Sequence, residues 1–326
     1  MTLATVPTPK SPTLPRAIER LGLAGLVAPE AMASAAQDQT ADTFGYKWHR
    51  TETFTSQPVQ AMSRTWMLDR YCGGDEARLD EWLAEPGRLI VDAGCGAGHS
   101  ALALFGDRLR AHDYLGIDIS TAVRVAAAQF AARGIPAGFL QHDLTTVPLP
   151  AGSVDLLFSE GVLHHTDDTR AAFLHLARAL APGGRFLAYV YAKKGPVREF
   201  TDDHIRAQLA ALDNDAAWRA LEPLTRLGIA LGELGATVHV PEAVPLLGIP
   251  AGPIDVQRLF YWHVCKLFHR PELTLDEMNH INFDWFRPAN CHRHTPGEVE
   301  AWCAEAGLSV ERLHVEEAGI TVVARR

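Results

Sequence analysis

Three glycines and one acidic residue have the types and spacing of a ligand-cradling loop. Gly94, Gly96 and Gly98 follow the apolar run 89–91, and Asp92 stands two residues before the first of them. Glycine has no Cβ, so the backbone can turn sharply and a ligand can lie against the amides at the start of the next helix. The order G-x-G-x-G differs from the dinucleotide fingerprint G-x-G-x-x-G, because the third glycine comes one residue early.

Two further acidic residues belong to the strand-like segments that follow. Asp118 closes the segment 112–119, twenty residues after the last glycine, where its carboxylate can accept hydrogen bonds from both hydroxyls of a ribose. Asp143 lies in the segment 139–144. Asp113, near the start of its segment, is predicted to be a solvated turn residue.

Consecutive motifs over residues 88–192 resemble those of the class I S-adenosylmethionine (SAM) dependent methyltransferases. The glycine loop resembles motif I, SVDLLFSEGVLHHT at 153–166 resembles motif IV, and Pro-Gly-Gly leads into a fifth strand. The resemblance implies SAM as the cofactor, with Asp92 and the glycine loop on its methionine part, Asp118 on the ribose and Asp143 on the adenine amino group. The implied cofactor-binding residues are Asp92, Gly94, Cys95, Gly96, Gly98, Asp118, Ile119, Asp143, Leu144 and Ser159.

The same resemblance implies an α/β fold. We expect a doubly wound, seven-stranded, mostly parallel sheet with an N-terminal helical cap and a helical, aromatic insertion. The expected parts are a disordered tail plus cap at 1–84, the SAM-binding core at 85–192, a substrate-side insertion at 193–294 and the returning core at 295–326. In the last part, the capping-box residues Thr295 and Glu298 predict a helix, and 309–315 with 320–324 predict an antiparallel hairpin.

The composition of the chain argues against some classes of binding partner. The 326 residues are 47% hydrophobic and 21% charged, which is typical of a soluble globular protein, and the formal net charge of -9 argues against nucleic acid. Five scattered cysteines without C-x-x-C spacing fit a reducing cytoplasm and no structural zinc. The longest apolar stretch, 227–253, is interrupted by charges and prolines, so no membrane partner is expected. The oligomeric state stays open.

Methyl transfer from a sulfonium is an in-line displacement, so the main task of the site is to hold the nucleophile in a dry pocket. A base is needed only where the nucleophile must lose a proton. His165, in the His-His pair after the fourth strand, Glu160 one turn earlier, and His280 in the insertion are the catalytic candidates. Histidines and Asp284 of the insertion match no metal-ligand signature, so no metal is predicted.

Aromatic residues suggest where a substrate binds. The segment 43–54 either caps the site or packs into the core. Alternating polar and apolar residues at 279–285 predict an extended segment with His280, Asn282 and Asp284 on one face. The substrate-binding candidates are Tyr46, Trp48, Tyr261, Asn282, Asp284 and His292.

The leading hypothesis is an enzyme that methylates an oxygen or nitrogen of a small molecule, in specialised metabolism. A second hypothesis uses SAM for aminocarboxypropyl transfer or cyclisation on the same fold. A third, a non-catalytic SAM-binding or partner-binding module, is disfavoured by the intact set of glycines and acidic residues.

Overall fold

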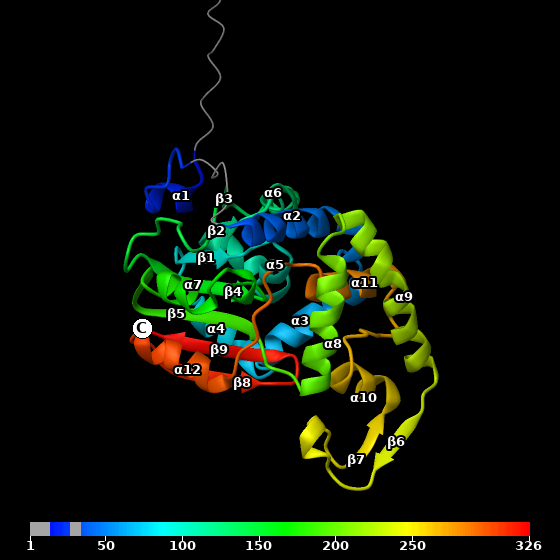
Figure 1. The fold of residues 1–326 in the computed structure, drawn as a ribbon. Helices are drawn as coiled ribbons and strands as arrows, with labels where there is room; N and C mark the ends of the chain where they lie inside the picture. The colour runs from blue at the N-terminus through cyan, green and yellow to red at the C-terminus, as the bar shows by residue number, and fades with distance from the viewer. Residues whose placement is uncertain (1–13, 27–33) are drawn as a thin grey trace, which may run out of the picture.

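A twisted seven-stranded sheet forms the centre of the protein in the computed structural model, which describes residues 14–26 and 34–326 (Figure 1). The strand order is β3-β2-β1-β4-β5-β9-β8. The strands from β3 to β5 are parallel, and β9 runs antiparallel to both β5 and β8. This confirms the predicted fold class. The strands are β1 Leu89–Ala93, β2 Asp113–Asp118, β3 Ala137–Gln141, β4 Val154–Glu160, β5 Leu180–Tyr191, β8 Ser309–Val315 and β9 Gly319–Arg325.

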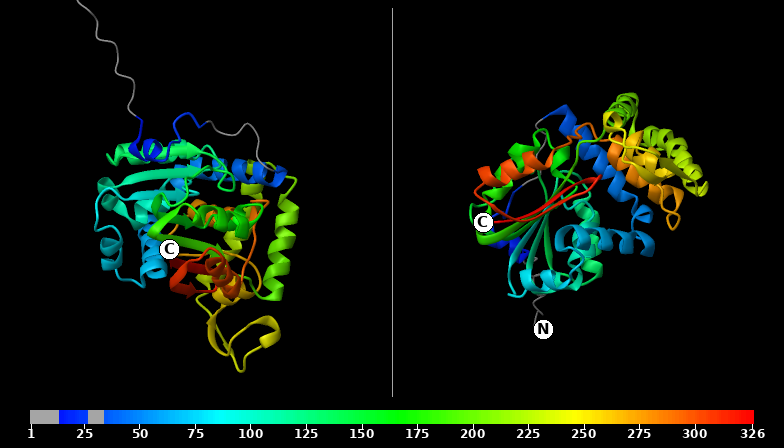
Figure 2. Two further views of the ribbon diagram at one scale, coloured as in Figure 1. Left: turned by 90° about the vertical axis from the view of Figure 1, so that its left-hand side faces the viewer. Right: turned by 90° about the horizontal axis from the view of Figure 1, so that it is seen from below.

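Helices cover both faces of this sheet (Figure 2). One face packs against α1 Arg16–Arg20, α7 Thr169–Ala177 and α12 Pro296–Glu305. The other face packs against α3 Gln57–Cys72, α4 Ala77–Trp82, α5 His99–Leu104 and α6 Val123–Ala132. Because both faces are covered, every residue of β1 and β2 is buried, and most of these residues are apolar.

The predicted return of the core at the C-terminal end is present. Thr295 Oγ1 accepts the backbone N–H of Glu298, and the Glu298 carboxylate accepts the backbone N–H of Thr295 at 2.7 Å, so both halves of the capping box form. The hairpin of β8 and β9 follows as predicted. Of the predicted tail, residues 1–13 lie outside the described residues.

The segment between β5 and α12 folds over the carboxyl ends of the parallel strands (Figure 1). It consists of α8 Pro196–Leu209, α9 Asn214–Glu233, β6 Thr237–Val240, β7 Gly252–Asp255, α10 Val256–His263 and α11 Leu275–Phe286. The strands β6 and β7 form a separate two-stranded arm. Helix α2, Ala35–His49, contacts α11 and so joins the N-terminal part to this segment.

The prediction of an extended segment at 279–285 was wrong, because these residues lie within α11. Thr274 and Glu277 form a capping box that starts the helix. The alternation is misleading because Asn279 and Asn282 are fully buried: the Thr225 hydroxyl donates to Asn279 at 2.7 Å, and the Asn282 amide donates to that hydroxyl. These two asparagines are therefore buried against α9 and do not form a solvent-facing edge.

Asp113 is also placed differently from the prediction. It is the first residue of β2, is buried, and accepts a hydrogen bond from Arg20 of α1 at 2.8 Å. The ion pair docks α1 on the sheet, so a side chain expected in solvent is part of the core boundary. Within the described ranges, no helix is long and apolar enough to cross a membrane.

Candidate active site

A cavity of about 620 Å³ lies at the carboxyl ends of the parallel strands. Residues after β1, β2 and β4 line it together with residues of α2, α3, α10 and α11. In an open parallel sheet, ligands bind outside the strand carboxyl ends where the strand order reverses, and β1 and β4 are adjacent at that point. The position is therefore that of a ligand site.

The glycine loop contributes Gly94 and Cys95 to the cavity wall. All three glycines have positive φ, as the loop requires. A Cβ at Gly96 would lie 2.6 Å from Trp48 Nε1, so the indole of α2 closes over the loop at that point. Gly98 instead meets Phe130 of α6 and serves the packing of helix against strand.

Asp118 lines the cavity with a carboxylate held in place by the backbone. It accepts the N–H of Gly96 at 2.8 Å, and the N–H and hydroxyl of Ser120 at 2.8 and 2.6 Å. A carboxylate has about four acceptor sites, so one remains for a ligand hydroxyl rather than the two predicted. Ile119 and Leu144 supply apolar surface beside it.

The remaining predicted cofactor residues stand behind the cavity wall. Asp92 is buried and accepts a hydrogen bond from the Tyr114 hydroxyl at 2.6 Å, and burial raises the pKa of its carboxyl to about 7. Asp143 accepts the N–H and hydroxyl of Thr145 in a turn. Ser159 donates to the carbonyl of Ala93 at 2.8 Å. These contacts shape the loops that carry the lining residues.

His165 lies in the cavity wall on the 3-10 turn Leu163–His165 after β4. Its Nδ1 is 2.7 Å from the carbonyl of Asn290, which can only accept, so Nδ1 carries the proton and Nε2 keeps its lone pair. Nε2 has no hydrogen-bond partner among the described residues. Burial lowers the pKa of His165 to about 4, so the ring is neutral near pH 7.

Glu160 also lines the cavity, but its oxygens are engaged. Arg70 donates to one oxygen at 3.0 Å, and the Tyr71 hydroxyl donates to the other at 2.6 Å. Arg70 also pairs with Glu316 at 2.7 Å. Burial raises the pKa of Glu160, while Arg70 opposes that rise. This geometry suits positioning Arg70 better than accepting a proton.

His280 does not reach the cavity. Its Nδ1 is 2.7 Å from the Thr53 hydroxyl, and its ring packs against Trp48 and Phe54 behind the cavity wall. Burial lowers its pKa far below the usual value. A catalytic role for His280 is inconsistent with this placement, because the indole of Trp48 stands at the cavity surface instead.

Some of the predicted substrate-binding residues line the cavity and others do not. Trp48, Tyr261 and Asp284 line the cavity. Three others do not: the Tyr46 hydroxyl donates to Asp215 at 2.7 Å, the Asn282 carbonyl accepts the N–H of Phe268, and the backbone of His292 donates to His164. Residues three or four apart lie on the same face of a helix. Asn282 and Asp284 are only two apart, so their side chains point in different directions from α11.

Several lining residues carried no signal in the sequence. Lys47 pairs with Asp284, which also accepts the Tyr191 hydroxyl at 2.6 Å. Burial would raise the pKa of Asp284, but Lys47 and other nearby cations hold it well below its usual range. Arg70 and Lys266 likewise reach the cavity from helices and loops far apart in the chain. Between residues 34 and 326 and within 14–26, no group of three or more His, Cys, Asp or Glu could hold a metal ion.

Comparisons with known proteins match the part of the chain that carries the glycine loop. Residues 91–188 match the family described as "Methyltransferase domain". The chain is 33% identical over 119 residues to "Uncharacterized methyltransferase YcgJ" of Bacillus subtilis, covering 36% of this chain and 46% of that protein. It is 29% identical over 155 residues to the malonyl-[acyl-carrier protein] O-methyltransferase of Serratia marcescens, covering 48% and 56% of the two chains.

A solved structure of magnesium protoporphyrin IX methyltransferase from Synechocystis PCC 6803 with bound SAM aligns with 91% of this chain and 99% of that one, at 16% identity and a TM-score of 0.44. The chain spans about half the length of the curated relatives named above.

Residues 91–188 match a methyltransferase domain, which agrees with the resemblance seen in the motifs, and that resemblance implies SAM as the cofactor. The residues present fit that group. Gly94 and Cys95 of the glycine loop line the cavity, and the Asp118 carboxylate beside them keeps one free acceptor site.

Proposed function

We propose that this chain transfers a methyl group from SAM to an oxygen or nitrogen of a small-molecule acceptor. One observation carries the proposal: a single cavity extends from the glycine loop of the methyltransferase domain to aromatic and charged residues of the 193–294 segment. Its volume of about 620 Å³ is within the range of small-molecule sites. Bound SAM supplies an electrophilic methyl carbon, and the chain supplies the walls that hold the acceptor against it.

His165 is our candidate for the residue that accepts the acceptor's proton. The Asn290 carbonyl fixes its Nδ1–H, which leaves the Nε2 lone pair available. A histidine whose pKa is about 4 is a weak base, but it is uncharged near pH 7 and therefore ready to accept a proton. Phe44 packs edge-on against the ring, with centroids 5.0 Å apart, and helps to hold its orientation.

The remaining charged residues exclude water and hold the walls together in this proposal. Lys47 of α2 pairs with Asp284 of α11 at the cavity wall. Glu160 and Glu316 orient Arg70 at the cavity surface. Prepositioned charges of this kind need no rearrangement when the acceptor binds.

Mass spectrometry of the purified protein tests the proposal. The protein is incubated with SAM alone and then with SAM and a metabolite extract. We expect S-adenosylhomocysteine only with the extract, together with a product heavier by one methylene. Release of methylthioadenosine would instead mean that the aminocarboxypropyl arm reacts, and methyl transfer would be the wrong chemistry.

A further inference from the structure

Some of the cations that line the cavity form ion pairs with carboxylates, and others do not. Lys47 and Arg70 each have carboxylate partners. Arg258, Lys266 and Arg270 also line the cavity, yet none of them forms an ion pair with a carboxylate in the described part of the chain. All three come from residues 258–270 of the 193–294 segment, which line part of the cavity wall.

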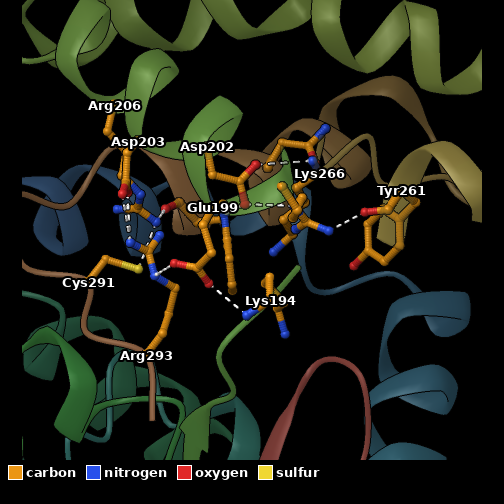
Figure 3. Close-up of polar contacts among 12 residues, drawn as sticks. Lys194, Glu199, Asp202, Asp203, Arg206, Tyr261, Lys266, Cys291 and Arg293 are labelled. Carbon is orange, nitrogen blue, oxygen red and sulfur yellow. Dashed lines mark hydrogen bonds and ion pairs between the residues drawn. The ribbon is translucent and has the colours of Figure 1, made fainter. Parts of the chain in front are cut away.

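Lys266 is the clearest of the three. The residue is only 6% exposed, and its ammonium lies 4.7 Å from the Trp285 ring centroid. In the region shown in Figure 3, Asp202 binds the Lys266 backbone N–H rather than the ammonium, and also accepts from Arg198 at 2.7 Å. Asp284 is taken by a lysine of α2 and by a tyrosine hydroxyl. The ammonium therefore faces the cavity without a hydrogen-bond partner among residues 14–26 and 34–326.

A buried ammonium with no partner is costly, because it has given up hydration without gaining hydrogen bonds. Burial lowers the pKa of Lys266 to about 7 for this reason. An anion placed against it would restore a charge-assisted hydrogen bond and favour the charged form.

Apolar side chains surround the same wall. Trp66, Tyr261, Trp262 and Phe268 all line the cavity. The Trp66 and Phe268 rings meet edge to face at 6.1 Å, and those of Tyr261 and Trp262 at 4.4 Å. Such a lining suits a planar or otherwise apolar body, with the cations left to bind one polar end.

We propose that the methyl acceptor is an aromatic or other largely apolar acid whose anionic group binds the ammonium of Lys266, with Arg258 and Arg270 adding positive charge at the same wall. The inference rests on the proposed function, since it assigns this cavity to the acceptor. It narrows the acceptor to molecules that carry a carboxylate or an equivalent anion.

Calorimetry with a matched pair of probes tests this. The protein is first titrated with S-adenosylhomocysteine and then, when saturated, with 2-naphthoate or 2-naphthamide, which differ in the charged group. We expect naphthoate to bind about tenfold more tightly or better, as for a buried charged hydrogen bond. Absence of that preference overturns the inference, whereas failure to bind S-adenosylhomocysteine would overturn the proposed function itself.

Two variants test which cations cause the preference for naphthoate over naphthamide. Lys266→Met keeps the apolar stem and removes the charge, and we expect it to lose the preference while S-adenosylhomocysteine still binds as before. Arg258→Gln combined with Arg270→Gln is a second probe that leaves Lys266 in place. Lys193→Met is the matched control, because Lys193 is exposed and pairs with Glu298 outside the cavity. A preference that survives Lys266→Met contradicts the assignment.

Discussion

His165 is the residue whose loss should affect turnover most directly. His165→Gln removes the Nε2 lone pair, and we expect kcat to fall about a hundredfold or more, since general bases typically contribute that much. The affinity for SAM should stay unchanged, because the glycine loop is untouched. Steady-state kinetics with the identified acceptor and calorimetry with SAM measure both quantities. His204→Gln, at an exposed position on α8, is the control, and equal kcat in the two variants would exclude His165 as the base.

Asp118 and His280 differ in their access to the cofactor. Asp118 lines the cavity and His280 does not. We therefore expect Asp118→Ala to weaken SAM binding by about tenfold or more, the scale of a lost charged hydrogen bond, and His280→Ala to weaken it far less. Calorimetric titration of both variants decides the matter. Equal or reversed losses would refute the assignment of Asp118 to the ribose.

Buried histidines should make the fold sensitive to acid. Burial lowers the pKa of His99 from 6.5 to about 4, while the ring contacts Ser63 and Gln60. Below pH 6.5, His99 binds a proton in the unfolded chain but not in the native chain. The free energy of unfolding therefore falls as the pH drops from 6.5 towards 4. The loss from this residue is about 3 kcal/mol in total.

The test for His99 compares urea unfolding of the native chain and His99→Gln between pH 7 and pH 4.5. Glutamine retains a hydrogen-bonding side chain but does not titrate. We expect a flatter dependence of the unfolding free energy on pH in the variant. Parallel curves would show that His99 already binds a proton in the native state.

At the scale of elements, the Lys47–Asp284 pair ties α2 to α11. Lys47 is buried, and its loss leaves a largely buried carboxylate without its cation. We expect Lys47→Met to cost about 3 kcal/mol in urea unfolding, and Lys47→Met with Asp284→Asn to recover most of that cost. Arg170→Met breaks the exposed Arg170–Glu305 pair and should leave the midpoint unchanged. A double variant no more stable than the single one would argue against the pair.

Element prediction from the sequence was reliable where local chemistry and packing agreed. Thr295 and Glu298 start α12 as predicted, because a capping box is satisfied within one turn. It was unreliable in α11, where Thr274 and Glu277 form the same motif, but buried asparagines disguise the helical period. Each of the two asparagines hydrogen-bonds to a residue of α9 more than fifty positions away, so no local pattern identifies these contacts.

For the whole molecule, we expect a bound ligand to slow hydrogen–deuterium exchange in lining elements that are far apart in the chain. Residues of α2 and of the glycine loop line one cavity although about fifty positions separate them. We expect S-adenosylhomocysteine to slow hydrogen–deuterium exchange in Ala35–His49 as well as in the loop, because binding stabilises the closed state by mass action. The β6 and β7 arm lines no part of this cavity and is the internal control. Unchanged exchange in α2 would mean that it does not close over the cofactor.

The sequence alone predicted the sheet core and the resemblance that implies SAM, because glycines, strand-ending acids and caps act over a few residues and keep their meaning in any context. Asp118 was identifiable as a cavity residue for this reason. Which side chains line the cavity could be read only from the three-dimensional structure. It placed Lys266 and Lys47 at the cavity and His280, Asn282 and His292 away from it. Those positions depend on how α2, α9, α10 and α11 pack against each other, and packing between distant segments leaves no periodic trace in the chain.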